Sequence, residues 1–123
     1  MKPRFATRLV WLILIVVSCA SPRDSVIRTL DSQEFTTKFG AEHSDWRETD
    51  KQQLPSAAVA TCFADLRSGG SKARFTFAKL YAHPKVDVLF AVFDTDDIDD
   101  FQVTYVFDRR QNKFVGKLWT GGA

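Results

Sequence analysis

The sequence is poor in the residues that build metal centres and disulfides. Its 123 residues include only two cysteines, Cys19 and Cys62, and two histidines, His43 and His83. Histidines forty residues apart do not have the spacing that a zinc site uses. The three consecutive residues His43, Ser44 and Asp45 cannot form a catalytic relay either, because such a relay needs side chains that converge in space. We therefore predict no metal centre, no cofactor and no catalytic residue.

The sequence also lacks a basic cluster beyond its first few positions. The formal charge is +2, but three of the 17 basic residues are Lys2, Arg4 and Arg8, and all 15 acidic residues follow residue 18. Without residues 1–18 the balance is 14 basic to 15 acidic residues, a net charge of −1. A near-neutral domain has no electrostatic footprint for nucleic acid. We exclude nucleic acid as a partner.

The first twenty residues have the three parts of a secretory signal. A basic start precedes the uncharged apolar run of residues 9–17, and small residues follow at 18–21. A membrane span is the competing interpretation. As a helix, however, even the whole uncharged stretch of residues 9–20 covers roughly 18 Å, against a hydrocarbon core of about 30 Å. The pattern therefore predicts export.

The end of this leader, Val16-Val17-Ser18-Cys19, resembles the lipobox of bacterial lipoproteins. The resemblance covers the leader alone. It implies removal of residues 1–18, lipid attachment to Cys19, and a domain anchored to a membrane and facing the periplasm or the cell surface. Ala20 after the cysteine implies the outer membrane where the source has two membranes. Ordinary signal-peptidase cleavage after Ala20 is the alternative.

The remaining 105 residues are enough for one domain. We expect a short tether at 19–24, a single domain at 25–119 and a flexible tail at 120–123. At about 3.5 Å per extended residue, the four residues 21–24 reach about 14 Å, which keeps the domain close to the membrane. Cys62 then has no partner for an internal disulfide.

Helical signals fill the first half of this domain. Apolar residues recur at helical spacing from residue 25, and Asp31 with Glu34 resembles a capping box before Gly40. The pattern does not decide between one helix and two over 25–39. A further helix is expected after Pro55, with an apolar stripe and Gly69-Gly70 at its end. The stripe consists of Val59, Cys62, Phe63 and Leu66.

The second half of the domain changes to a period of two. Four runs, at 73–81, 85–94, 101–108 and 113–119, indicate strands joined by short turns. Residues 41–54 are interpreted as a connecting loop around Trp46. The predicted fold class is α+β: two or three helical segments followed by a four-stranded antiparallel meander, with the helices on one face. A cystatin-like or NTF2-like arrangement is suggested by analogy only.

Two local patterns are candidates for chemistry. Cys62 could act as a nucleophile, but its place on the apolar stripe favours a buried structural cysteine. The acidic loop that follows the second strand could bind calcium. It does not match an EF-hand, and a hydrated hairpin tip is the simpler interpretation. Its aspartates are Asp94, Asp96, Asp97, Asp99 and Asp100.

The strand pattern also leaves apolar residues for a second sheet face. If the helices cover the other face, a stripe of Leu80, Leu89, Ala91, Phe93 and Val106 could bind a partner protein. The alternative is internal cover by the Trp46 loop or by the first helical segment. We therefore expect a non-catalytic, membrane-anchored envelope lipoprotein that binds another envelope or secreted protein, as an inhibitor or immunity factor. The alternative is a structural or assembly subunit of an envelope complex.

Overall fold

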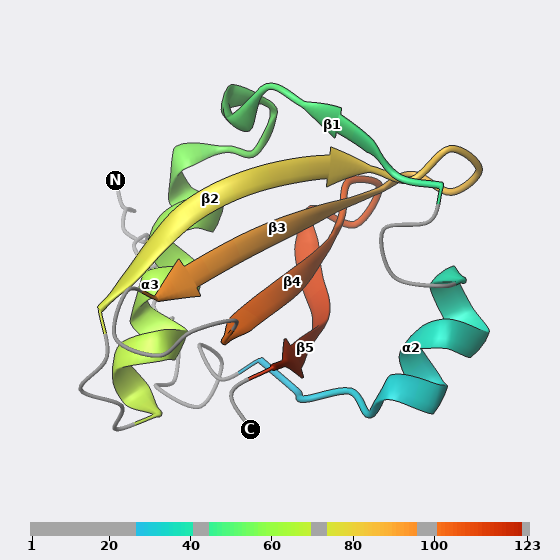
Figure 1. The fold of residues 1–123 in the computed structure, drawn as a ribbon. Coiled ribbons are helices and arrows are strands. Elements are labelled where there is room, and N and C mark those ends of the chain that lie inside the picture. Colours follow the sequence, from blue (N-terminus) through green and yellow to red (C-terminus); the bar gives the residue numbers. More distant parts are fainter. Residues whose placement is uncertain (1–26, 41–44, 70–73, 96–100, 122–123) are drawn as a thin grey trace, which may run out of the picture.

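The computed structural model describes residues 27–40, 45–69, 74–95 and 101–121. Within these ranges two α-helices accompany one five-stranded antiparallel sheet of order β1-β2-β3-β4-β5, so the fold is α+β (Figure 1). The elements are α2 (Ser32–Phe39), β1 (Arg47–Thr49), the 3-10 turn η3 (Lys51–Gln53), α3 (Ser56–Ser68), β2 (Phe75–Ala82), β3 (Val88–Thr95), β4 (Gln102–Asp108) and β5 (Lys113–Thr120).

Four of the five strands are the predicted ones, and they form the predicted meander. The fifth, β1, lies in the segment predicted to be a loop, so the strand count was wrong. Three residues are too few to show a period-two pattern, and β1 is defined by its antiparallel pairing with β2, in which Glu48 lies opposite Tyr81. At the other end of the chain, β5 extends through Thr120, the first residue of the predicted tail.

The segment at 27–31 is extended, and the helix expected there is absent. Leu30 N–H donates to the Lys117 carbonyl at 2.8 Å, and Lys117 N–H donates to the Arg28 carbonyl at 2.9 Å. Thr29 thereby forms a parallel bridge with Lys117. The edge of β5 thus supplies the hydrogen bonds that a helix would have made internally. The rest of the predicted helix, residues 24–26, lies outside the described residues.

The signals for the helix ends were correct. The Asp31 side chain accepts a hydrogen bond from Glu34 N–H at 2.7 Å and begins α2. Gly40, at φ 84°, ends it, with its N–H bonded to the Thr36 carbonyl. Helix α3 begins after Pro55 and ends at Gly69.

The two helices pack on opposite faces of the sheet, so their predicted placement on one face was wrong. Strand β3 explains the difference, because every residue from Val88 to Phe93 is buried and each face therefore needs cover. The α3 side contains the larger apolar cluster, with Ala58, Cys62 and Leu66 from the helix. The α2 side contains a smaller cluster built around Phe35, Trp46 and Phe90.

Candidate binding groove

The apolar stripe proposed to bind a partner is buried. Leu80, Leu89, Ala91, Phe93 and Val106 have no exposed surface. The first four belong to the cluster under α3, and Val106 belongs to the cluster under α2. An irregularity in the β2–β3 register between Phe77 and Lys79 places Leu80 in the same cluster as Phe77. The prediction of an open stripe was therefore wrong.

Part of the alternative, internal cover, is found on the α2 side. The Trp46 ring stacks on Phe90 with 3.7 Å between ring centroids. The centroid of the Phe35 ring lies 5.9 Å from that of the Phe90 ring. Trp46, in the segment predicted to be a loop, and the start of the domain thus both contribute to covering this face.

A buried charge cluster was not foreseen from the sequence. Asp65 Oδ1 accepts a hydrogen bond from Ile27 N–H at 2.8 Å, and Oδ2 accepts from Tyr105 Oη at 2.7 Å and from Lys117 Nζ at 2.6 Å. Burial, followed by the hydrogen bond to Asp65, raises the pKa of Tyr105. Asp65 follows Cys62 by three residues and therefore lies on the same, buried side of α3. This spacing in the sequence indicates a buried carboxylate. The cluster ties α3, β4, β5 and the extended segment together.

Cys62 is buried, as predicted. Burial, with a further contribution from the charge of Asp65, raises the pKa of its thiol. A thiol held in its protonated form and without solvent access does not act as a nucleophile.

The acidic loop lies largely outside the described residues, and the predicted lipid site lies wholly outside them. Asp94, half-buried near the end of β3, is described, whereas Asp96, Asp97, Asp99 and Asp100 are not, and neither is Cys19. Over the ranges that the structure covers, no three metal-ligating side chains come together. In the same ranges no helix is both long and apolar enough to cross a membrane.

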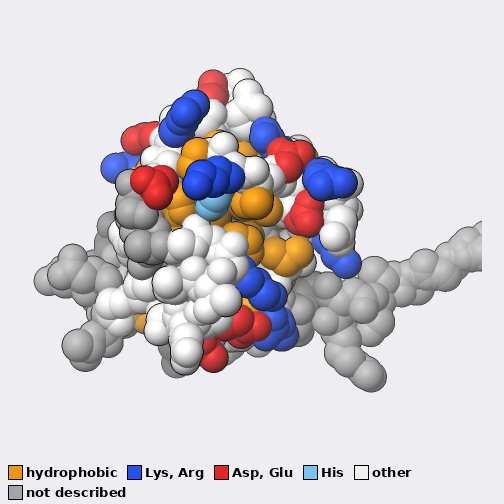
Figure 2. All heavy atoms as spheres, turned by 90° about the vertical axis from the view of Figure 1, so that its right-hand side faces the viewer, with side chains coloured by type: hydrophobic (Ala, Val, Ile, Leu, Met, Phe, Trp, Pro, Cys, Tyr) orange, Lys and Arg blue, Asp and Glu red, His pale blue; other side chains and the backbone are white. Residues whose placement is uncertain are grey.

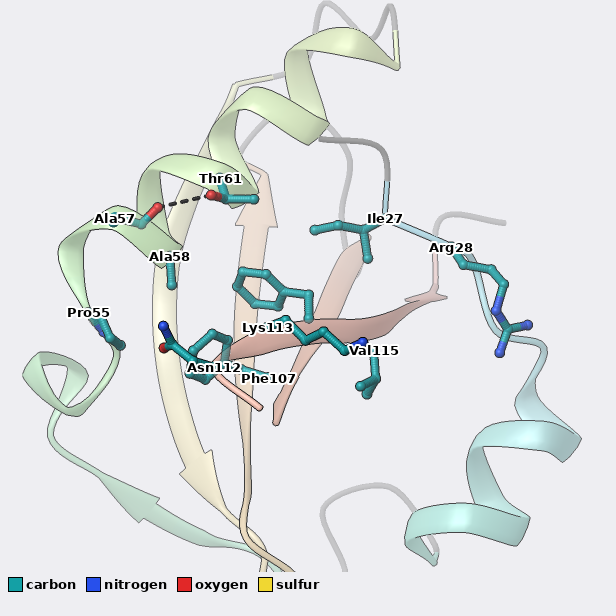
Figure 3. Close-up of a pocket in the computed structure, with 11 residues that line it drawn as sticks. Ile27, Arg28, Pro55, Ala57, Ala58, Thr61, Phe107, Asn112, Lys113 and Val115 are labelled. Carbon is teal, nitrogen blue, oxygen red and sulfur yellow. Dashed lines mark hydrogen bonds between the residues drawn. The ribbon is translucent and has the colours of Figure 1, made fainter. Parts of the chain in front are cut away.

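One hollow lies between the start of α3, residues 27 and 28, and the β4–β5 hairpin (Figure 3). It has a volume of about 540 Å³ and a mostly apolar lining. Its polar groups do not converge, since Thr61 donates to the Ala57 carbonyl of its own helix and Arg28 is turned toward α2, where Glu34 binds it at 2.8 Å. We therefore assign no chemistry to it.

A second hollow has more distinctive surroundings, and we name it the turn groove. It lies between the end of α2, the start of β1 and the β2–β3 turn, and its volume is about 690 Å³. Figure 2 shows this side of the molecule, where hydrophobic side chains surround the pale blue histidine and Lys and Arg side chains border them. The lining residues are Lys38, Phe39, Gly40, Asp45, Arg47, His83, Pro84, Lys85 and Val86.

His83 fixes the shape of the groove. Its Nδ1 accepts hydrogen bonds from the backbone N–H groups of Lys85 at 3.0 Å and Val86 at 3.2 Å. Nδ1 is therefore unprotonated, and Nε2–H donates to the Phe39 carbonyl at 3.0 Å. That carbonyl belongs to the last turn of α2, which needs partners from outside the helix. One imidazole ring thus joins the β2–β3 turn to the end of α2.

The lining of the groove combines an exposed apolar side chain with cations. Val86 is 44% exposed, and it is the one large hydrophobic residue classed as exposed among the described residues. Arg47 and Lys85 are exposed and take part in none of the ion pairs among the described residues. With Lys38 they place three cations against one carboxylate, Asp45, among the described residues of the lining. The groove is therefore a concave surface with an apolar centre and a positive rim.

Comparisons with protein-family models, with curated proteins and with solved structures found no match for this chain.

Proposed function

We propose that the protein is an exported lipoprotein, anchored through Cys19, that binds another envelope or secreted protein in the turn groove. The observation that carries the proposal is the exposure of Val86 in a concave, hydrogen-bonded frame, while the other large apolar side chains of the described residues are buried or half-buried. Rigid frames of this kind bind with little loss of conformational entropy. An inhibitor or immunity factor is the role that suits such a surface.

The titratable groups support binding rather than catalysis. Both ring nitrogens of His83 hold backbone groups in place, so the imidazole has no free nitrogen to exchange protons with a substrate. Both oxygens of Asp65 are hydrogen-bonded, and the residue is buried. The cystatin-like or NTF2-like analogy belongs to this proposal, and its support is the packing of α3 against one face of an antiparallel meander.

The anchor is tested by labelling cells that produce the full chain with radioactive palmitate. We expect the label to enter the protein, and the protein to fractionate with membranes, whereas Cys19→Ala loses both. A Cys19→Ala protein that still fractionates with membranes would show that the lipid is not the anchor.

The groove is tested by placing a photo-crosslinking amino acid at position 86 of the full chain in cells. The matched control carries the same amino acid at position 67, an exposed site on α3 outside the groove. We expect a discrete protein adduct from position 86 only. A secreted enzyme in the adduct favours an inhibitor or immunity factor, and a stoichiometric envelope complex favours the assembly role. Equal adducts from both positions, or none, would contradict binding in the groove.

A further inference from the structure

We propose that the turn groove accepts an acidic peptide segment in which carboxylates flank an apolar side chain. This inference rests on the proposed function and names the chemistry of the partner. The turn groove has two features that such a segment would match: a cationic rim and an apolar centre.

The cations come from separate elements but lie at one end of the sheet. Arg47 begins β1 and lies opposite Ala82, the last residue of β2. Lys85 follows three residues later in the turn. Both are exposed and outside the ion pairs of the described residues, unlike Arg109, which binds Asp87 at 2.7 Å. An incoming carboxylate would therefore not have to displace an existing partner.

The centre of the groove supplies the apolar contact. Val86 is exposed there, and Phe39 and Pro84 lie in the same lining. A Cβ added at Gly40 would meet no atom of the described residues within 4 Å. An apolar side chain of the partner can enter here while its neighbours reach the cations.

The carboxylate of Asp45 favours a peptide over an anionic membrane surface. It lies in the groove lining and is exposed. A uniformly anionic lipid surface would be repelled by it. A peptide can instead place a backbone N–H or a hydroxyl beside it, because the charges of a peptide are discrete.

The test uses the full chain, purified from membranes in a non-ionic detergent. The probe is the peptide Glu-Glu-Leu-Phe-Glu-Glu-amide with fluorescein on its terminal amino group, and binding is followed by fluorescence anisotropy. Peptides with lysine in place of glutamate, or with Ser-Gly in place of Leu-Phe, are the ligand controls. We expect the acidic peptide to bind best, with affinity that falls as salt is added.

Charge reversal then locates the binding. We expect Arg47→Glu with Lys85→Glu to weaken the acidic peptide by about tenfold or more at low salt. The control pair, Arg67→Glu with Arg110→Glu, makes the same change in net charge at exposed positions outside the groove, and we expect little effect. If the reversed pair fails to fold, Arg47→Gln with Lys85→Gln replaces it, with a smaller loss expected. Equal weakening by groove and control pairs, or equal binding of the lysine peptide, would overturn the proposal.

Two further outcomes identify what has failed. Mixed micelles containing phosphatidylglycerol that bind through Arg47 and Lys85, while the peptide does not bind, would show that the groove takes lipid, and the proposal would be wrong. A protein adduct from position 86 that is unchanged by Arg47→Glu with Lys85→Glu would leave the binding function standing and overturn its acidic chemistry. Absence of that adduct from the wild-type chain would count against the binding function itself.

Discussion

The two sides of the sheet use their polar groups in opposite ways. Under α3, one carboxylate is buried with three donors around it, and the cluster is closed to solvent. On the α2 side, aromatic rings fill the interior, and polar groups collect at the end of the sheet, where Val86, Arg47 and Lys85 face solvent. His83 combines features of both sides, because its ring is half-buried and its hydrogen bonds hold the backbone that lines the exposed groove.

We propose that this difference separates the residues that stabilise the fold from those that bind a partner. A change in the Asp65 cluster disturbs several elements at once, because the cluster joins residues far apart in the chain. A change on the rim of the turn groove removes a side chain that supports little else.

The largest effect is expected for Lys117→Met. The substitution keeps the length of the side chain but leaves the Asp65 carboxylate, with 1% of its side chain exposed, without its counter-ion. Breaking a buried ion pair from one side costs about 3–5 kcal/mol. The free energy of unfolding of the purified protein, measured with urea, should fall by about this amount.

Two variants check the interpretation. Asp65→Asn added to Lys117→Met removes the unpaired charge and should recover part of the loss, because the amide oxygen can accept from Ile27 N–H while the amide NH2 donates to Tyr105 Oη. Lys113→Met, at an exposed position at the start of β5, should change the free energy of unfolding by less than about 0.5 kcal/mol. A Lys117→Met protein as stable as Lys113→Met would show that the pair contributes nothing.

A smaller effect is expected for Gly116→Ala, which probes how the extended segment sits on β5. The new Cβ would lie 2.6 Å from Leu30 Cγ and 2.7 and 2.9 Å from its two methyl carbons. Leu30 is buried, so it cannot simply turn away. Overpacking of this kind costs about 1–3 kcal/mol. In a double-mutant cycle measured by urea unfolding, Gly116→Ala should cost less when Leu30→Ala is already present, and additive losses would contradict the contact.

Alkaline pH should weaken the α3 side gradually. In the unfolded chain a thiol loses its proton near pH 8.5 and a phenol near pH 10. Burial raises the pKa of Cys62 and Tyr105 in the folded protein, so both keep their protons to higher pH. The contribution of each group is fully present below its unfolded pKa. It is lost as pH rises above that value, by up to about 1.4 kcal/mol per unit and per group.

The measurement is the free energy of unfolding from pH 7 to pH 10.5. Cys62→Ala should flatten the decline above pH 8.5, and Tyr105→Phe should flatten it above pH 10, even though each variant is less stable at neutral pH. Curves that stay parallel to the wild type would contradict the burial of these groups as the cause.

The sequence predicted the elements better than it predicted their arrangement. Strand alternation, the cap at Asp31 and the glycine at 40 are local signals, and they located four strands and two helices. The pairing of residues 27–31 with β5 and the register irregularity beside Lys79 depend on contacts far along the chain, so local periodicity did not reveal them. The irregularity decides which cluster Leu80 joins. Leu89, Ala91 and Phe93 lie opposite Phe107, Tyr105 and Val103 of β4 and share their buried cluster, and this pairing also depends on contacts that local periodicity does not show.

The turn groove was missed for a related reason. Its residues come from three separate segments, and none of the segments carries a motif by itself. His83 was one of only two histidines, but its three partners are backbone groups, which a sequence does not display. An exposed valine between a lysine and an aspartate resembles an ordinary turn until the neighbouring α2 and β1 are in place.

The smallest effect on stability is expected for Val86→Ser. The side chain is 44% exposed, and the residue's backbone N–H, which donates to His83, is retained by serine. The free energy of unfolding should change by less than about 0.5 kcal/mol, because exposed substitutions away from special backbone positions rarely do more. Binding of the acidic fluorescent peptide should nevertheless weaken by several-fold, since the partner loses its apolar contact. The two quantities are measured on the same preparation by urea unfolding and anisotropy. A large loss of stability would show that Val86 contributes to the folded core. Unchanged peptide affinity would show that Val86 does not contact the peptide.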